Sequence, residues 1–202
     1  MKNNIYISST NENKIEEINA FFRENKINFE IKKPKIDLSK IIEDGETFYE
    51  NAKIKAIYLA SRMNYSEYVL ADDSGLCIEE LNGFPGINSA RFTVDGKTDY
   101  KTKNQYLIQR LGNNKNKKAK FVCCLVLIDK NRNLHKFESF SEGLILENKN
   151  EIKRNFGFDP IFYSIEAKKF FSDLDENEKN KYSHRGKSLC QLSTFLNNIK
   201  NS

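Results

Sequence analysis

The sequence has few of the residues that build zinc sites and disulfide frameworks. Its 202 residues include two histidines and four cysteines, and Cys77, Cys123, Cys124 and Cys190 form no CxxC pair. This argues against a zinc site, and we expect the four cysteines to be reduced core residues. A bound metal should instead be a hard cation held by carboxylates, which means Mg²⁺, with Mn²⁺ as the alternative.

Long apolar runs, internal repeats and blocks of like charge are also missing. No run approaches a membrane span, and the apolar stretch in the N-terminal MKNNIYISS is too short for a signal peptide. We therefore expect a cytoplasmic protein with no membrane partner. The 33 basic and 28 acidic residues give a formal charge of +5, but they are mixed along the chain. This mixture favours a small anionic ligand over a stable nucleic-acid partner.

What the sequence does have is enough apolar material for a core. Hydrophobic residues make up 39% of the chain and aromatic residues 12%, which is typical of a folded protein. The length suits a single domain over residues 1–202.

The most constrained stretch runs from Val69 to Phe92. Val69–Ala71 has the pattern of a buried strand, which we expect to end at Asp72 and Asp73 before a turn at Ser74–Gly75. Acids at the exposed end of a buried strand can build a site beside a rigid core. The alternative is an ordinary solvated turn, since these residue types favour turns. Adjacent like charges repel unless a cation neutralises them, which favours a site.

A second candidate site lies where the predicted strand Ile5–Ile7 runs into a helix. Ser9 and Glu12 have the spacing of a capping box, and apolar residues then repeat at helical spacing. The free N–H groups and the positive end of a helix attract anions, and Asn11 and Lys14 would point from this end. The segment lacks the glycines of a P-loop, and a plain N-cap with a solvated lysine is the alternative.

Periodicity and capping predict the remaining elements. They are a strand over 29–33, a helix capped by Thr47, a helix capped by Thr98, a basic linker over 113–120, a central strand over 121–128 and a last helix opened by Ser183–Lys187. The basic linker is interpreted as a solvated loop. His135 is interpreted as a surface residue without a partner. Glu46 and Glu50 are explained by the helix dipole, whereas Glu43 is not.

Two segments near the C-terminus suit a planar or anionic ligand. Phe156–Asp159 places aromatic residues on both sides of a glycine, and such rings can stack on a base. A tight turn between core strands explains this segment equally well. His184 and Arg185 stand at a helix entrance downstream of Lys179, which suits an anion or the carbonyl of a ring.

Together these motifs resemble the inosine triphosphate pyrophosphatase family, also called the Ham1 or non-canonical purine NTP pyrophosphatases. The matching segments are Ser9–Lys14, Glu43–Gly45 with Thr47–Phe48 and Glu50–Ala52, Ala71–Leu76, Pro85–Gly86 with Ser89–Phe92, Phe156–Phe162 and Ser183–Gly186. Each is weak alone, but six in the family's order over almost the whole chain are specific. Ser9–Thr10 departs from the frequent Thr-Gly, and Phe158 replaces a common tyrosine.

The resemblance implies an α/β fold with a long twisted mixed sheet, flanking helices and two lobes with a central cleft. It also implies a homodimer that needs Mg²⁺ and hydrolyses ITP, dITP and XTP to the monophosphate plus pyrophosphate. By position, the metal carboxylates are Glu43 and Asp73, and the proton acceptor is Asp73, a task that Asp72 is a candidate to share. The implied substrate-binding residues are Ser9, Thr10, Asn11, Glu12, Asn13, Lys14, Ser74, Phe156, Gly157, Phe158, Asp159, Lys179, His184 and Arg185.

Two other functions stay open. A nucleotide- or RNA-binding module would use the basic linker and the aromatic loop without turnover. A pyrophosphatase of the Maf type, acting on modified pyrimidine or 7-methyl nucleotides, is an enzymatic rival, although the His184–Arg185 pair argues against it. A turnover assay with Mg²⁺ separates binding from hydrolysis, because a binding module would release no pyrophosphate.

Overall fold

The computed structural model describes residues 3–148 and 156–200. Its strands, in chain order, are β1 (Asn3–Ser8), β2 (Phe29–Lys32), β3 (Tyr68–Ile78), β4 (Lys118–Ile128), β5 (Leu134–Ile145), β6 (Phe162–Ser164) and β7 (Lys169–Phe170). Its α-helices are α1 (Glu12–Glu24), α2 (Phe48–Arg62), α3 (Tyr100–Leu111), α4 (Glu176–Tyr182) and α5 (His184–Lys200). Short 3₁₀ helices are η1 (Glu79–Leu81), η2 (Gly86–Asn88), η3 (Asp159–Ile161) and η4 (Phe171–Asp173).

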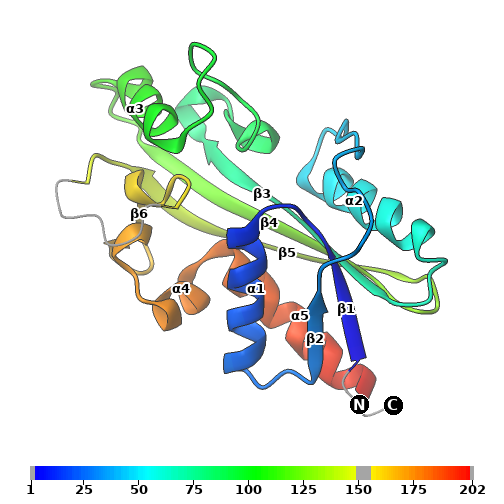
Figure 1. The fold of residues 1–202 in the computed structure, drawn as a ribbon. Coiled ribbons are helices and arrows are strands. Elements are labelled where there is room, and N and C mark those ends of the chain that lie inside the picture. The colour runs from blue at the N-terminus through cyan, green and yellow to red at the C-terminus, as the bar shows by residue number, and fades with distance from the viewer. Residues whose placement is uncertain (1–2, 149–155, 201–202) are drawn as a thin grey trace. The chain divides into compact units, whose positions relative to one another are not determined.

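The strands form a mixed seven-stranded sheet in the order β2-β1-β3-β4-β5-β6-β7 (Figure 1). β1 pairs in parallel with both β2 and β3, whereas β6 pairs antiparallel with β5 and β7. The expected mixed sheet with flanking helices is therefore confirmed. β4, the most apolar strand of the sequence, is central in the order, as its buried pattern predicts.

The chain divides into two compact units, and each is made of several segments of sequence. The first unit comprises residues 1–73, 123–139 and 188–202, and the second comprises residues 74–122 and 140–187. Three strands, β3, β4 and β5, continue from one unit into the other. That residues 1–202 behave as a single domain stays a prediction.

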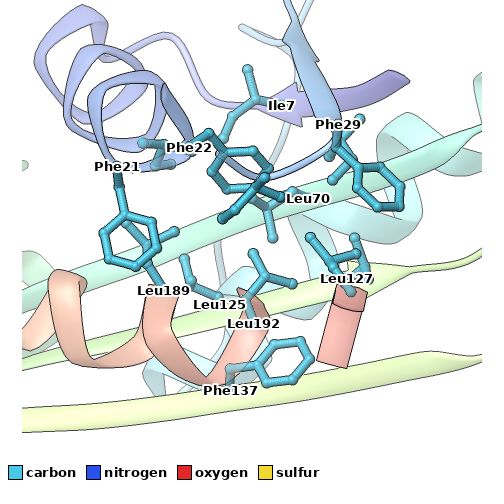
Figure 2. Close-up of a cluster of buried hydrophobic side chains, with 14 of the residues drawn as sticks. Ile7, Phe21, Phe22, Phe29, Leu70, Leu125, Leu127, Phe137, Leu189 and Leu192 are labelled. Atoms are coloured by element: carbon cyan, nitrogen blue, oxygen red, sulfur yellow. The ribbon is translucent and has the colours of Figure 1, made fainter. Parts of the chain in front are cut away.

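The first unit has two hydrophobic clusters. One packs α1 and α5 against alternate residues of β1, β3 and β4, with Phe21, Leu70, Leu125 and Leu192 at its centre (Figure 2). The other packs α2 against the intervening residues, among them Ala71. Because successive strand residues point to opposite faces, one cluster covers each face of these strands.

The second unit has one hydrophobic cluster, rich in aromatic rings. It joins α3, the neighbouring parts of β3 and β4, and the short elements η3, β6 and η4. Phe121 lies edge-on to Phe162 at 4.7 Å between ring centroids and is parallel to Phe171 at 5.6 Å. Short elements bury little surface by themselves, and these rings pack β6 and η4 against β4.

Several predicted boundaries are wrong, each for a local reason. α1 is capped by Asn11 rather than Ser9, because the Asn11 side chain accepts from the N–H groups of Asn13 and Lys14. α3 is capped by Asp99 rather than Thr98. β4 begins at Lys118, so only the first part of the predicted linker over 113–120 lies outside a strand.

Two side-chain interpretations are also wrong. His135 has a partner, since its Nε2 lies 3.0 Å from Asp129 Oδ2, and its ring packs 4.2 Å from that of Phe195. The four cysteines are free, but Cys190 is exposed and Cys77 only half-buried, so they are not all core residues.

Within the described ranges, no helix is both long and apolar enough to cross a membrane.

Candidate active site

Asp72 and Asp73 lie inside a strand rather than at its end. β3 continues from Tyr68 to Ile78 through the predicted turn, and the two acids are only 1% and 5% exposed. The pairing of β1 with β3 stops at Ser8 and Ala71, so both acids lie just beyond the carboxyl end of β1. In sheets of this kind, ligands bind outside the carboxyl ends of the parallel strands.

The two acids point to opposite faces of β3. Asp72 lies on the face covered by α1, where its Oδ1 pairs with Lys14 Nζ at 2.5 Å and its Oδ2 accepts from the Cys123 thiol at 3.4 Å. Asp73 lies on the face covered by α2, where its Oδ1 pairs with Lys55 Nζ at 2.6 Å. Each carboxylate is therefore neutralised by its own lysine, which answers the repulsion expected of adjacent acids.

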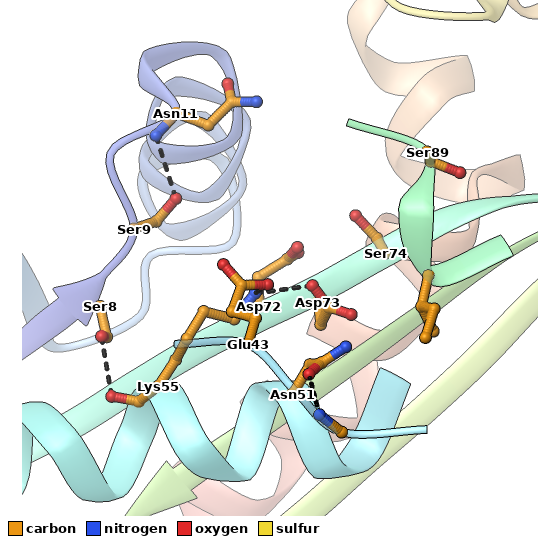
Figure 3. A network of polar contacts seen from close by, with 12 residues as sticks. Ser8, Ser9, Asn11, Glu43, Asn51, Lys55, Asp72, Asp73, Ser74 and Ser89 are labelled. Atoms are coloured by element: carbon orange, nitrogen blue, oxygen red, sulfur yellow. Dashed lines mark hydrogen bonds and ion pairs between the residues drawn. The ribbon is translucent and has the colours of Figure 1, made fainter. Parts of the chain in front are cut away.

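Lys55 joins Asp73 to Glu43. Its ammonium lies 3.4 Å from Glu43 Oε2, and the lysine is only 8% exposed (Figure 3). A buried ammonium needs charged partners, and here two carboxylates from distant segments supply them. We call Glu43, Lys55 and Asp73 the α2-side cluster.

Burial raises the pKa of Asp73 above its ordinary value of 3.8, although Lys55 and Lys14 act in the opposite direction. Its second oxygen, Oδ2, is buried and has no hydrogen-bond partner among the described residues. A carboxylate oxygen that is buried without a donor can accept a hydrogen bond from a ligand or bind a cation.

Glu43 and Asp73 are suitable ligands for Mg²⁺. Both offer hard oxygen donors, and Mg²⁺ in phosphate-handling sites commonly binds one or two carboxylates plus phosphate and water oxygens. No group of three or more His, Cys, Asp or Glu side chains with metal-binding geometry occurs in the described part of the chain. The protein thus provides at most a partial coordination shell, which substrate would complete.

The turn that carries Glu43 rests directly on the start of α2. Thr47 and Glu50 form the predicted capping box there. The Gly45 N–H donates to Asn51 Oδ1 at 2.9 Å, and a Cβ on Gly45 would lie only 2.6 Å from the Glu50 Cβ. The close approach requires glycine at this position, so the Glu43-Asp44-Gly45 motif is a packing requirement as well as a source of a carboxylate.

The predicted phosphate loop, residues 9–14, runs from the end of β1 into the first turn of α1. Asn11 uses its side chain to cap the helix, and its own N–H donates to Ser9 Oγ at 3.2 Å. Glu12 is exposed and forms an ion pair with Lys33. Thr10 and Asn13 are exposed. Lys14 is the cation that this loop turns toward the strand carboxylates.

The predicted base-binding residues belong to the second unit. Arg185 is 3% exposed, and its Nη2 donates to Ser74 Oγ at 2.8 Å. The ring of His184 lies parallel to that of Phe121 at 4.6 Å between centroids. Arg185 is therefore hydrogen-bonded to Ser74, the residue that directly follows Asp73 in the chain.

A buried ion pair anchors the aromatic loop. Lys179 pairs with Asp159, and both residues are almost completely buried. The same ammonium lies 5.5 Å from the centroid of the Phe156 ring. Asp159 begins η3, so this pair ties α4 to the loop between Phe156 and Ile161.

The ring of Phe158 is part of the core. It is 3% exposed, stacks against Phe92 at 6.2 Å and meets Tyr100 edge-on at 5.1 Å. Asn104 Nδ2, from α3, donates to the Gly157 carbonyl at 3.1 Å. α3 thus holds the loop by the packing of Tyr100 and by one hydrogen bond from a side chain to the backbone, and the half-buried Phe156 is the ring left at its surface.

Two buried polar residues of α2 escaped the sequence-based prediction of the site: Lys55, of the α2-side cluster, and Asn51, which holds the turn after Glu43. Lys55 and Asn51 lie one helical turn apart on the buried side of α2, next to Ala52 and Ala56. The sequence did contain a signal for them. A lysine and an asparagine at helical spacing with buried apolar residues are unusual, because polar residues without a function normally lie on the exposed face of a helix.

A model of the Ham1 family matches residues 5–195. The chain belongs to the Ham1 family. It is 38% identical over 196 residues to the dITP/XTP pyrophosphatase of Borrelia garinii subsp. bavariensis, with 95% of each chain covered. It is also 38% identical over 202 residues to the dITP/XTP pyrophosphatase of Clostridium perfringens, covering 96% of this chain and 97% of that one.

Two solved structures support the same assignment. The Ham1 protein of Staphylococcus aureus superposes with a TM-score of 0.81 at 31% identity, and a HAM1 protein from Coxiella burnetii superposes with a TM-score of 0.78 at 34% identity. Each comparison covers 97% of this chain and 99% of the other. The similarity therefore extends over both units.

Proposed function

We propose that this Ham1-family protein hydrolyses non-canonical purine nucleoside triphosphates, namely ITP, dITP and XTP, to the monophosphate and pyrophosphate. The observation that carries the proposal is the α2-side cluster, in which Glu43 and Asp73 converge on one buried lysine. Relatives that match nearly the whole chain are dITP/XTP pyrophosphatases. The chemistry below assigns the triphosphate to the first unit and the base to the second.

The first unit supplies charge and a base for phosphoryl chemistry. Lys14, at the start of α1, and the positive end of that helix would attract the triphosphate. Asp73 Oδ2 accepts a proton from the attacking water, since it is the oxygen of that carboxylate without a partner. Asp72 holds Lys14 in place through its ion pair, so the two acids have separate roles.

Glu43 and Asp73 would hold Mg²⁺, with Mn²⁺ as the alternative. The bound ion would neutralise charge on the phosphates and on the departing pyrophosphate. The water oxygen bonds to the α-phosphorus, one water proton passes to Asp73, and the bond from the α-phosphorus to the bridging oxygen breaks.

The second unit would recognise the base. A guanidinium only donates hydrogen bonds, so Arg185 pairs with the 6-oxo group of inosine or xanthine and faces the 6-amino group of adenine donor to donor. The Phe156 ring offers a face for stacking, which does not depend on the identity of the base. Guanine also has a 6-oxo group, so we assign its rejection to the Phe156–Asp159 loop near the 2-position.

A panel of nucleotides tests the proposal. ITP, dITP, XTP, ATP and GTP are incubated with the protein and Mg²⁺, and phosphate is measured with and without a coupled inorganic pyrophosphatase. We expect phosphate only in the coupled reaction, and much faster turnover for ITP, dITP and XTP. Direct release of orthophosphate, a preference for ATP, or tight binding without turnover would reject the assignment. Modified pyrimidine and 7-methyl nucleotides, added to the panel, test the Maf-type alternative.

The remaining expectations are proposals of the same kind. We propose a cytoplasmic homodimer whose partners are small purine nucleotides, without a stable nucleic-acid partner. Light scattering coupled to gel filtration tests the dimer, which a mass close to the 23.5 kDa of one chain would contradict.

A further inference from the structure

We propose that Asn51 is a catalytic residue that holds the attacking water against Asp73. This inference deepens the proposed function and rests on it. Asn51 is completely buried near the start of α2, one helical turn before Lys55. Alanine or leucine would bury apolar surface at this position, whereas burying an amide costs free energy unless its polar atoms are bonded. The presence of asparagine here therefore requires an explanation.

Half of that amide has a structural role. Its oxygen accepts the Gly45 N–H at 2.9 Å, which fixes the turn that carries Glu43 (Figure 3). This bond alone would be satisfied equally well by an aspartate, because it uses only the acceptor.

The other half of the amide is a buried donor without an acceptor. Asn51 Nδ2 has no hydrogen-bond partner among the described residues, and neither has Asp73 Oδ2, which is a buried acceptor. Asn51 holds the Gly45 N–H, two residues after Glu43, and Asp73 shares Lys55 with Glu43, so both side chains belong to one polar network (Figure 3). Unsatisfied groups of this kind are rare in folded proteins, and two in one cluster point to a ligand.

Water is the ligand that fits both atoms. It accepts a hydrogen bond from Nδ2 through one lone pair and donates one to Asp73 Oδ2, leaving its second lone pair for the α-phosphorus. When that lone pair forms the new oxygen–phosphorus bond, the proton already directed at Asp73 passes to it. The bond to the bridging oxygen then breaks with its electron pair. Asn51 thus orients the water that Asp73 deprotonates.

Asn51→Asp separates the two roles of the amide. The acceptor for Gly45 is kept and the donor is replaced by an oxygen of similar size. With dITP as substrate, we expect kcat to fall by about 10²-fold while KM stays within about threefold, as for the loss of one oriented group in the transition state. Binding of Mn²⁺ without nucleotide, followed by electron paramagnetic resonance, should be no weaker than in the wild type. Asn113→Asp, the same change at an exposed position, should alter neither measurement.

Asn51→Ala removes both roles. Because Glu43 then loses the support of its turn, we expect the affinity for Mn²⁺ to fall about tenfold in addition to the loss of kcat. If Asn51→Asp does not fold, Asn51→Ser is the neutral substitute, and its kcat should lie between those of the alanine variant and the wild type.

Three results would overturn the assignment of Asn51. They are a kcat within threefold of wild type in Asn51→Asp, a tenfold weaker binding of Mn²⁺ in that variant, or a kcat for Asn51→Ser equal to wild type. A wild-type protein that hydrolyses no nucleoside triphosphate would instead overturn the proposed function. The Mn²⁺ titrations distinguish the two failures, because they need no nucleotide.

Discussion

The two units build their parts of the candidate site in different ways. In the first unit, Lys55, Asp72 and Asp73 lie within a helix and a strand, and opposite charges neutralise one another. In the second unit, the Phe156–Asp159 loop has no regular structure before η3 and is held by rings, an ion pair and one amide. Groups on strands and helices are positioned more precisely than groups on loops.

This difference matches the two tasks that we propose for the units. Phosphoryl transfer needs charges fixed to a fraction of an ångström, and the reacting phosphates are the same in every nucleotide. Base selection needs a surface that can vary, and loops on a rigid scaffold provide it. We therefore expect changes in the first unit to lower turnover for all substrates alike, and changes in the second to alter the ratio between substrates.

Asp73→Asn should have the largest effect. The change keeps the size of the side chain but removes the proposed proton acceptor and one of the proposed metal ligands, so kcat should fall by about 10²–10⁴ for every substrate. Asp44→Asn, an exposed position next to Glu43, is the control and should be close to wild type. Steady-state kinetics with dITP and XTP measure both. Near-normal activity of Asp73→Asn would move the proton acceptor elsewhere, first to Asp72.

Lys55→Met should affect both activity and stability. The substitution removes the buried ammonium that Asp73 and Glu43 share, and the loss of one partner of a buried ion pair costs about 3–5 kcal/mol of unfolding free energy. We also expect kcat/KM to fall by about 10²-fold, equally for dITP and XTP. Lys53→Met, an exposed lysine on the same helix, is the matched control. A melting temperature equal to that of the control would show that the pairing of Lys55 contributes little.

Local patterns were enough to predict much of the fold but not the course of β3. The apolar runs of β4 and the periodicity of α2 and α5 identify them, because burial of those faces decides their structure. Asp72-Asp73-Ser74-Gly75 favours a turn locally, yet it lies in a strand. The reason is distant in sequence, since Lys14 and Lys55 neutralise the two acids from opposite faces. Pairing of that kind cannot be deduced from local propensity.

For the candidate site, motif order pointed to Glu43, Asp73 and Arg185, whose roles stay a prediction. The structure shows that Glu43 and Asp73 share Lys55, a contact that the motifs did not indicate. It did not show that the Phe158 ring is enclosed by Phe92 and Tyr100, because an aromatic residue in a core and one that stacks on a base have the same local signature.

Arg185→Ala tests the second unit. If Arg185 reads the 6-oxo group, its loss should lower ITP turnover much more than ATP turnover and reduce the ratio of kcat/KM values about tenfold or more, which corresponds to about 1–3 kcal/mol. Lys187→Ala, which removes a half-buried lysine paired with Glu166, is the control. An unchanged ratio in Arg185→Ala would assign base reading to another residue, whatever happens to the absolute rates.

Asn104→Ala should have a smaller effect confined to the loop. The substitution removes the hydrogen bond to the Gly157 carbonyl, so amide exchange over 156–161 should become faster in the absence of nucleotide. We expect KM for dITP to rise about three- to tenfold while kcat changes less than twofold, since one hydrogen bond contributes about 0.5–1.5 kcal/mol. Gln105→Ala, an exposed neighbour, is the control. Unaltered exchange would mean that ring packing and the Lys179–Asp159 ion pair hold the loop without this hydrogen bond.

The smallest expected effect is a pH dependence that distinguishes the units. Burial raises the pKa of Asp73 above 3.8, so its folded state takes up a proton at higher pH than the unfolded chain does. The stability that this carboxyl contributes is therefore fully present below its unfolded pKa and is lost as pH rises through the folded pKa. In metal-free protein, the unfolding free energy of wild type minus that of Asp73→Asn should decrease from acid to neutral pH.

Burial also raises the pKa of Tyr100, in the second unit, above 10.0. The unfolding free energy of wild type minus that of Tyr100→Phe should therefore stay constant from acid to neutral pH and change only in alkali. Urea unfolding at a series of pH values measures both, and a flat profile for Asp73→Asn would show that Lys55 and Lys14 fully offset the burial of that carboxyl.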